Sequence, residues 1–198
     1  MSDFYHQGSR ELQDRFDTRR LADRIEQRLV VDRIGDADKA FIESLDMFFL
    51  ATTDEAGQPS CSYKGGEAGF VRVVDAVTLA FPNYDGNGMF LSMGNVVRHP
   101  RVGMLFIDFE RQRRLRLSGE ASISVDDPCW PNYAEAQFIV RVAVTHVFPN
   151  CPRYIHKYQR VERSTFVPRA GCETPVPNWK RNDWATDVLP EKDPARSR

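Results

Sequence analysis

AFPNYDGNGMFLSMGNVVRHPRVGMLFIDFERQRRLRLSG, residues 80–119, is the stretch that decides the fold. It predicts a strand, a polar turn over 82–88, a short helix over 89–98, and two more strands over 101–109 and 113–125. The turn is rich in glycine and asparagine, which tolerate positive φ angles, and it leads directly into the helix. Unpaired backbone N–H groups at a helix start attract anions. The stretch therefore predicts a β-rich fold with an anion site at one corner.

Length and composition indicate one soluble folded domain. The 198 residues are 41% hydrophobic and 28% charged, which is enough for one substantial core. The formal net charge of −1 gives no general attraction to nucleic acid or to an anionic membrane, so neither is expected as a partner. No apolar run approaches the length of a transmembrane helix.

The cysteines and the first residues bear on the compartment. The four cysteines, Cys61, Cys129, Cys151 and Cys172, form no Cys-x-x-Cys pair, which argues against a zinc site. They predict free thiols in a reducing cytoplasm, although an even number also permits two disulfides. Residues 1–8 have neither the basic start nor the apolar centre of a secretory signal. We therefore expect a cytoplasmic protein.

The apolar periodicity divides the chain into three segments. Residues 1–45 are expected to form a helical segment that packs on a barrel, with helices over 10–29 and 36–45. Residues 46–160 have the period of strands, expected at 47–53, 59–64, 70–74, 77–81, 101–109, 113–125 and 137–148. Six or seven strands in hairpin order predict a mainly β fold, a small antiparallel barrel with flanking helices.

The third segment, residues 161–198, is a proline-rich C-terminal tail. Its prolines exclude long elements, and we expect it to lie on the body of its own subunit or on a partner subunit. Residues 191–198 are expected to be disordered. A short helix is also expected after the last strand, with Pro152 in its first turn.

A phosphate site is the first chemical hypothesis. Lys64 ends a strand beside a glycine-rich loop, and Arg72 lies in the next strand. Asn83, Gly86 and Asn87 lie in the turn before the short helix. A phosphate dianion needs cationic donors and exposed N–H groups, and these segments supply both. The alternative is that the two cations are ordinary strand charges and that the glycines only form turns.

Other candidates have weaker signals. Arg114 and Arg116 share one face of an alternating strand, where arginines usually meet solvent or a carboxylate. Tyr154, Trp179 and Trp184 could stack on a planar cofactor, or they could anchor the tail to the body. The histidines do not cluster, and no nucleophile elbow or acidic cluster occurs, so neither a metal site nor a catalytic side chain is predicted. If the protein is an enzyme, a cofactor carries the chemistry.

Several segments together resemble the pyridoxamine 5′-phosphate oxidase-related flavoproteins, which share the FMN-binding split barrel. The resemblance covers about residues 40–156. It is carried by Lys64-Gly65-Gly66, Gly69-Phe70-Val71-Arg72-Val73, Phe81-Pro82-Asn83-Tyr84-Asp85-Gly86-Asn87, Gly94-Asn95 and the strand that starts at His99-Pro100-Arg101-Val102. In this family FMN lies at the interface of a homodimer, so the resemblance implies FMN as the cofactor and a second copy as the partner.

The resemblance also implies roles for individual residues. It places Lys64, Arg72, Asn83 and Asn87 near the phosphate or the ribityl chain. It makes the backbone of Phe70 and Val71 a donor to the flavin ring. The implied cofactor-binding set is Lys64, Phe70, Val71, Arg72, Pro82, Asn83, Asn87, Arg114 and Tyr154, with Tyr154 as a contact from the partner subunit.

This chain departs from the true oxidases in two places. They carry Ser-Arg-Lys in the turn where this chain has Gly86-Asn87-Gly88, and the Arg-x-x-x-Ser and Arg-x-His motifs for pyridoxal phosphate are absent. The resemblance therefore implies an FMN-dependent oxidoreductase that acts on another, unidentified small molecule. Two alternatives remain. The chain could bind flavin, haem or a deazaflavin without turnover, or it could be an interaction module with an empty pocket.

Overall fold

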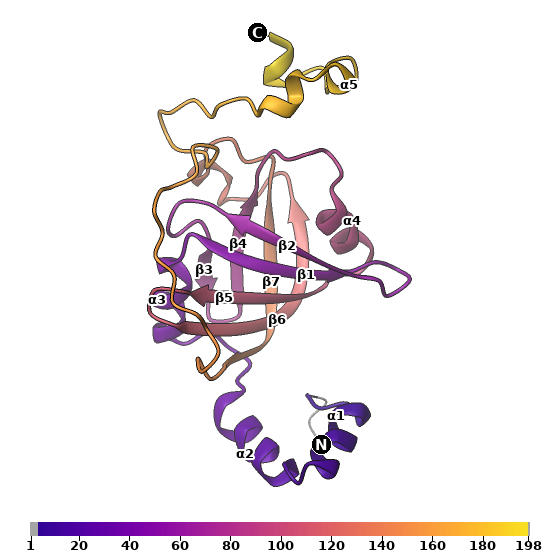
Figure 1. Ribbon diagram of the computed structural model, residues 1–198, viewed down its shortest axis with the longest axis vertical. Coiled ribbons are helices and arrows are strands. Elements are labelled where there is room, and N and C mark those ends of the chain that lie inside the picture. Colours follow the sequence, from indigo (N-terminus) through magenta and orange to yellow (C-terminus); the bar gives the residue numbers. More distant parts are fainter. Residues whose placement is uncertain (1–3, 198) are drawn as a thin grey trace.

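Seven antiparallel strands form one curved sheet in the computed structural model, which describes residues 4–197 (Figure 1). The strand order is β2-β1-β5-β6-β7-β4-β3, and the edge strands β2 and β3 do not pair with each other. The strands are β1 (Met47–Thr53), β2 (Pro59–Gly65), β3 (Arg72–Asp75), β4 (Thr78–Asn83), β5 (Arg101–Asp108), β6 (Arg113–Ser124) and β7 (Phe138–Pro149). The sheet is thus a barrel that is split between its edges, and the predicted six- to seven-stranded antiparallel fold is confirmed.

Alternate side chains of the strands fill the barrel. Phe48 of β1 is fully buried, and its ring lies 5.0 Å from the Phe81 ring, 5.4 Å from the Phe106 ring and 5.8 Å from the Phe70 ring, measured between centroids. These residues come from three strands and from the loop after β2. The aromatic cluster therefore joins distant parts of the sheet into one core.

Strand β6 alternates as the sequence predicts, with one interruption. Leu115 and Leu117 point into the barrel, while Arg114 and Arg116 lie on the outer face. The pairing of β6 with β7 shifts between Ser118 and Gly119. A Cβ atom at Gly119 would lie 2.4 Å from the carbonyl oxygen of Ala143, so only glycine fits this close approach of the two strands.

Two helices close the ends of the barrel. Helix α3 (Asp36–Ser44) buries Phe41 and Ile42, and helix α4 (Leu91–Arg98) buries Ser92, Met93 and Val96. Both helices were predicted from the sequence, α4 with two more residues at its start. Helix α4 contacts β1, β2 and β6 and thus lies near the split side of the barrel.

The expected helix over 10–29 is wrong, because the chain breaks it into α1 (Gln7–Arg15) and α2 (Arg19–Leu29). Asp17, between them, has a φ angle of +53°, which a continuous helix does not allow. Neither helix buries a residue. We call residues 4–29 the N-terminal arm; it projects from the barrel in Figure 1.

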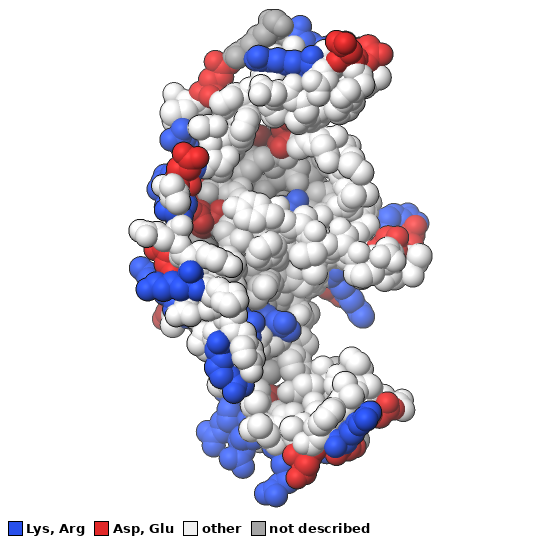
Figure 2. All heavy atoms as spheres, in the orientation of Figure 1, with Lys and Arg blue, Asp and Glu red and all other residues white. Residues whose placement is uncertain are grey.

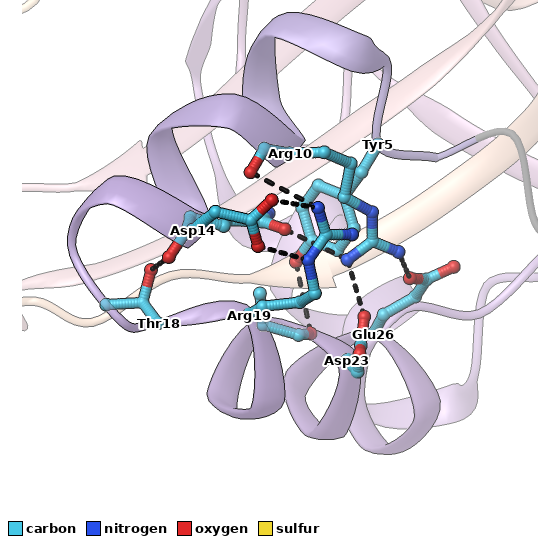
Figure 3. A network of polar contacts seen from close by, with 9 residues as sticks. Tyr5, Arg10, Asp14, Thr18, Arg19, Asp23 and Glu26 are labelled. Atoms are coloured by element: carbon cyan, nitrogen blue, oxygen red, sulfur yellow. Dashed lines mark hydrogen bonds and ion pairs between the residues drawn. The ribbon is translucent and has the colours of Figure 1, made fainter.

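Polar side chains hold the arm together (Figure 3). Arg10 of α1 forms an ion pair of 2.5 Å with Asp23 of α2, and Arg19 forms an ion pair with Asp14. The Tyr5 hydroxyl donates to the carbonyl oxygen of Ala22. The ion pairs Arg10–Asp23 and Arg19–Asp14 therefore join the two helices.

The C-terminal part contains only short elements. Helix η1 (Trp130–Asn132) lies in the connector before β7, and the last residues form η2 (Asn178–Arg181), α5 (Asp183–Thr186) and η3 (Pro194–Ser197). No helix forms between β7 and η2 among the described residues, so the helix expected at Pro152 is wrong. Asp193 is only 7% exposed, so the disorder expected for residues 191–198 is also wrong where the structure describes them. None of the described helices is both long and apolar enough to cross a membrane.

Candidate functional site

Lys64 lies near the end of the edge strand β2, beside the opening between the two edges of the sheet, which we call the mouth. Lys64 lies opposite Phe48 in the β1–β2 register and therefore points to the inner face of the sheet. Its side chain is half-buried, and burial lowers the pKa of its ammonium group. Its ammonium group forms neither a hydrogen bond nor an ion pair with any of residues 4–197. A desolvated cation without a counter-charge favours an anion as its neighbour.

Helix α4 covers this mouth through two polar contacts. The Ser62 and Ser92 hydroxyls lie 3.0 Å apart, and the Asn95 amide donates to the Thr52 hydroxyl at 3.0 Å. The residue before α4, Phe90, has a φ angle of +49° and offers no side-chain cap. The first N–H groups of α4 therefore remain available for an anion.

Tyr84 anchors the turn between β4 and α4, because its side chain packs against the barrel core. Burial, and then the negative charges of Glu67 and Glu135, raise the pKa of Tyr84 to about 12. Figure 2 shows the same face, which is hollowed below the C-terminal segment and has a basic side chain inside the hollow.

Two asparagines shape the turn. The Asn83 amide donates to the Gln137 side chain at 2.9 Å, which ties the start of the turn to β7. The Asn87 side-chain oxygen accepts the N–H group of Met89 at 3.1 Å just before α4. Both side chains thus have structural partners, while the glycines on either side of Asn87 have open space around them.

Arg72 is not brought next to Lys64. Arg72 pairs with Ala80 in the β3–β4 register and lies on the outer face of the sheet. Its guanidinium carbon is 5.5 Å from the centroid of the Tyr133 ring, a cation–π contact with the connector. The two cations that the sequence suggested as one clamp therefore point to opposite faces of the sheet.

Phe70, Val71 and Pro82 border the mouth but offer few free donors. The Phe70 N–H group donates to the Glu67 carbonyl oxygen at 2.9 Å, so it is already used within the loop. The side chains of Phe70 and Val71 are buried. Pro82 pairs with Ile139 in the sheet and has no N–H group.

Arg114 and Tyr154 lie elsewhere, at the end of the sheet where β7 stops. The Arg114 guanidinium donates to the Cys151 carbonyl oxygen at 2.8 Å, and its Nε atom is buried without a partner. Tyr154 is 82% exposed, and the Arg153 guanidinium lies 5.6 Å from its ring centroid. Within one chain these residues are not part of the mouth around Lys64.

A cavity of about 640 Å³ lies on the outer side of β2, and Lys64 is not part of its lining. Its walls come from the start of β1, Tyr63, the loop 66–68, the end of β5 and the segment 158–167. Ion pairs of Arg160 with Asp46 and of Arg163 with Glu67 hold that segment over it. The lining contains the carboxylates Asp46, Glu67, Asp108, Glu110 and Glu162 against the cations Arg111, Arg160 and Arg163. This excess of negative charge disfavours a phosphate dianion, so we place the anion site at the mouth.

No group of three histidine, cysteine, aspartate or glutamate side chains in the described part of the chain is placed to hold a metal ion. Sequence reasoning missed Ser62, Ser92 and Thr52, which fix α4 over the mouth. Their signal is weak, because single hydroxyl groups are common on strands and helices. Asn95 was quoted only as part of the family resemblance.

Comparisons with known proteins agree with this architecture. The family model described as "Pyridoxamine 5'-phosphate oxidase" matches residues 34–162. No curated protein matches the chain. HupZ of Group A Streptococcus is 21% identical, and the match covers 59% of this chain and 99% of HupZ with a TM-score of 0.48.

Two further solved structures are more distant in sequence or structure. An FMN-binding protein from Syntrophomonas wolfei is 9% identical, with 71% of this chain and 97% of that chain covered and a TM-score of 0.44. HutZ, the haem storage protein of Vibrio cholerae, is 18% identical, with 60% and 92% covered and a TM-score of 0.40. Because the identities and TM-scores of these structures are low, the family is assigned from the match to the family model, and the fold is described from the strand order.

Proposed function

The chain belongs to the pyridoxamine 5′-phosphate oxidase family, and on this premise we propose that it is an FMN-dependent oxidoreductase. It acts on a small organic molecule, as a homodimer, in the cytoplasm. FMN supplies the group that accepts and donates hydride or electrons, and the protein supplies binding and orientation.

Lys64 is the observation that carries the proposal. Its ammonium group is half-buried at the mouth of the barrel, and burial lowers its pKa. A phosphate group beside it would replace the lost hydration of the ammonium group with a charge-assisted hydrogen bond. The adjacent turn and the start of α4 add backbone N–H groups, so the donor set fits a phosphate monoester.

Two other features support the arrangement. Tyr84, with its pKa raised to about 12, keeps its hydroxyl proton at neutral pH and serves as a hydrogen-bond donor beside the turn. Met89, Phe90 and Leu91, at the start of α4, are 61%, 48% and 60% exposed. A second copy that covers them would exclude water from the mouth, as expected for a cofactor at a subunit interface.

Titration of the purified protein with FMN, followed by flavin fluorescence, tests the phosphate site. We expect Lys64→Met to weaken FMN binding about tenfold or more, since a charge-assisted hydrogen bond contributes about 1.5–3 kcal/mol. Lys64→Arg should retain most of the affinity. Lys157→Met, which removes an exposed lysine, is the matched control and should bind FMN like the wild type. Unchanged affinity in Lys64→Met would place the phosphate elsewhere.

The pH dependence of binding gives a second test of the same residue. The free protein has a lowered Lys64 pKa, and a bound phosphate raises it by charge attraction. FMN affinity should therefore be constant below the lowered pKa and fall as the pH rises through it. Lys64→Met should remove this decline. A wild-type affinity that stays flat over the same pH range would contradict the role of Lys64.

Spectra and turnover separate the alternatives. A yellow protein with flavin absorption that oxidises reduced nicotinamide in the presence of an acceptor supports an enzyme. Flavin binding without turnover supports a carrier. A strong absorption band of bound haem would identify haem, and not FMN, as the cofactor. A colourless protein whose properties FMN does not change would contradict the proposal.

A further inference from the structure

The last residues of the chain fold into a small unit of their own. We call residues 178–196 the C-terminal cap; it stands apart from the barrel in Figure 1. Ala185 and Leu189 are buried within it, and the Trp179 and Trp184 rings stack with centroids 5.9 Å apart. The cap therefore has a minimal core and a defined structure.

Lys180 is the buried cation of the cap. It is 3% exposed, and its Nζ atom lies 2.7 Å from Asp193 Oδ2 and 2.6 Å from Asp85 Oδ2. Burial opposes its charge, but the hydrogen bonds to Asp193 and Asp85 outweigh that effect and raise its pKa. Asp193 also accepts the N–H group of Ala195 at 2.9 Å, so this carboxylate is fixed inside the cap.

Asp85 is the partner that does not belong to the cap. It lies 95 residues earlier, in the turn that opens α4, and its side chain is 57% exposed. Among the described residues, the pair with Lys180 is the one long-range hydrogen bond or ion pair that residues 85–88 form. A side chain added at Gly86 or Gly88 would meet open space, and the hydrogen bond from Met89 N–H to Asn87 is local, so Lys180 ties this part of the turn to a distant segment.

We propose that the C-terminal cap is a clamp on the anion-binding turn and that Lys180 is its positioning residue. Lys180 holds Asp85 and thereby orders the N–H groups of residues 86–90. It also neutralises a carboxylate that would otherwise repel a phosphate in the same turn. Lys180 is not itself a phosphate ligand, because two carboxylates already surround it. The FMN part of this inference rests on the function proposed above, and the ordering of the turn does not.

Backbone ¹⁵N relaxation of the full-length protein without FMN tests the clamp directly. We expect Asp85→Ala and Lys180→Met to lower the order parameters of residues 86–90 from the range of a rigid backbone, about 0.85, to below about 0.6. Lys180→Arg should keep the wild-type order parameters, and so should Lys192→Met, which removes an exposed lysine of the same cap. Asp85→Ala is the cleaner variant, because it leaves the buried Lys180–Asp193 pair intact.

FMN titration of the same variants adds the functional part. We expect about tenfold weaker binding in Asp85→Ala and Lys180→Met and wild-type binding in Lys180→Arg and Lys192→Met. Lower order parameters of residues 86–90 in the variants of a protein that never binds FMN support the clamp and overturn the proposed function. Order parameters that are unchanged in both Asp85→Ala and Lys180→Met overturn the clamp. Stronger FMN binding in Asp85→Ala overturns the ordering role, because the carboxylate would then act by repulsion alone.

Discussion

The two ends of the chain are both small helical units, yet they place polar and apolar side chains in opposite ways. In the N-terminal arm, ion pairs such as Arg10–Asp23 lie between the helices, and apolar side chains such as Leu21, which is 60% exposed, face outward. In the C-terminal cap, Leu189 and the Lys180–Asp193 pair are buried. The contrast shows that charge pairs stabilise very differently according to how much water surrounds them.

Removing one member of the buried pair should give the largest effect. Asp193→Ala leaves the Lys180 ammonium group buried with only the exposed Asp85 beside it. Breaking such a pair typically costs about 3–5 kcal/mol, so we expect the cap to unfold locally while the barrel stays folded. Hydrogen exchange of residues 180–189 measures this loss. Asp187→Ala, an exposed carboxylate in the same cap, is the control, and equal protection in both variants would contradict the role of the pair.

Acid should release the cap for the same reason. Burial alone would raise the pKa of Asp193, but the hydrogen bond from Lys180 dominates and lowers it below its ordinary value of 3.8. The stabilisation is therefore complete above that value and is lost as the pH falls through the lower, folded-state pKa. Tryptophan fluorescence of Trp179 and Trp184 reports the change. A cap that opens already near neutral pH would contradict the assignment.

The prediction from sequence succeeded where periodicity decides and failed where distant charges meet. Alternating apolar residues, as in Leu115 and Leu117, located the strands and the small antiparallel barrel, and the family resemblance added that the barrel is split. Nothing in the sequence links Lys180 to Asp85, because a contact across 95 residues leaves no local pattern. The one-helix prediction for 10–29 failed since apolar spacing does not reveal a single backbone reversal at Asp17.

The candidate site shows the same division. The sequence placed Lys64 near the end of a strand, before the glycine-rich loop, and it placed the polar turn before a short helix. The structure has both arrangements. The face of the sheet on which a side chain lies depends on register, which sequence alone does not determine for strands at opposite edges of the sheet. Arg72 therefore looked like a second phosphate ligand, although its guanidinium packs on Tyr133 outside the barrel.

Opening the ion pairs of the arm should have a smaller effect than opening the buried pair of the cap. Arg10→Met removes the ion pairs with Asp23 at 2.5 Å and with Glu26 at 3.9 Å. All three side chains are partly exposed. We expect a loss of about 0.5–1 kcal/mol in the local stability of the arm, since exposed pairs are screened by water. Hydrogen exchange of α2 measures it, and 0.5 M salt should reduce the difference from wild type. A loss as large as that of Asp193→Ala would abolish the contrast between the two ends.

The smallest effect is expected from an apolar side chain of the arm. Leu21 is 60% exposed, whereas Ile42 of α3 is fully buried in the barrel core. Leu21→Ser should change the unfolding free energy of the chain by no more than about 0.5 kcal/mol, because most of its side-chain surface stays in water on folding. Ile42→Ser should cost about 3 kcal/mol or more, since it leaves a cavity and buries a hydroxyl. Chemical denaturation of both variants at low protein concentration compares them. Equal losses would mean that this face of α2 packs on another surface in solution.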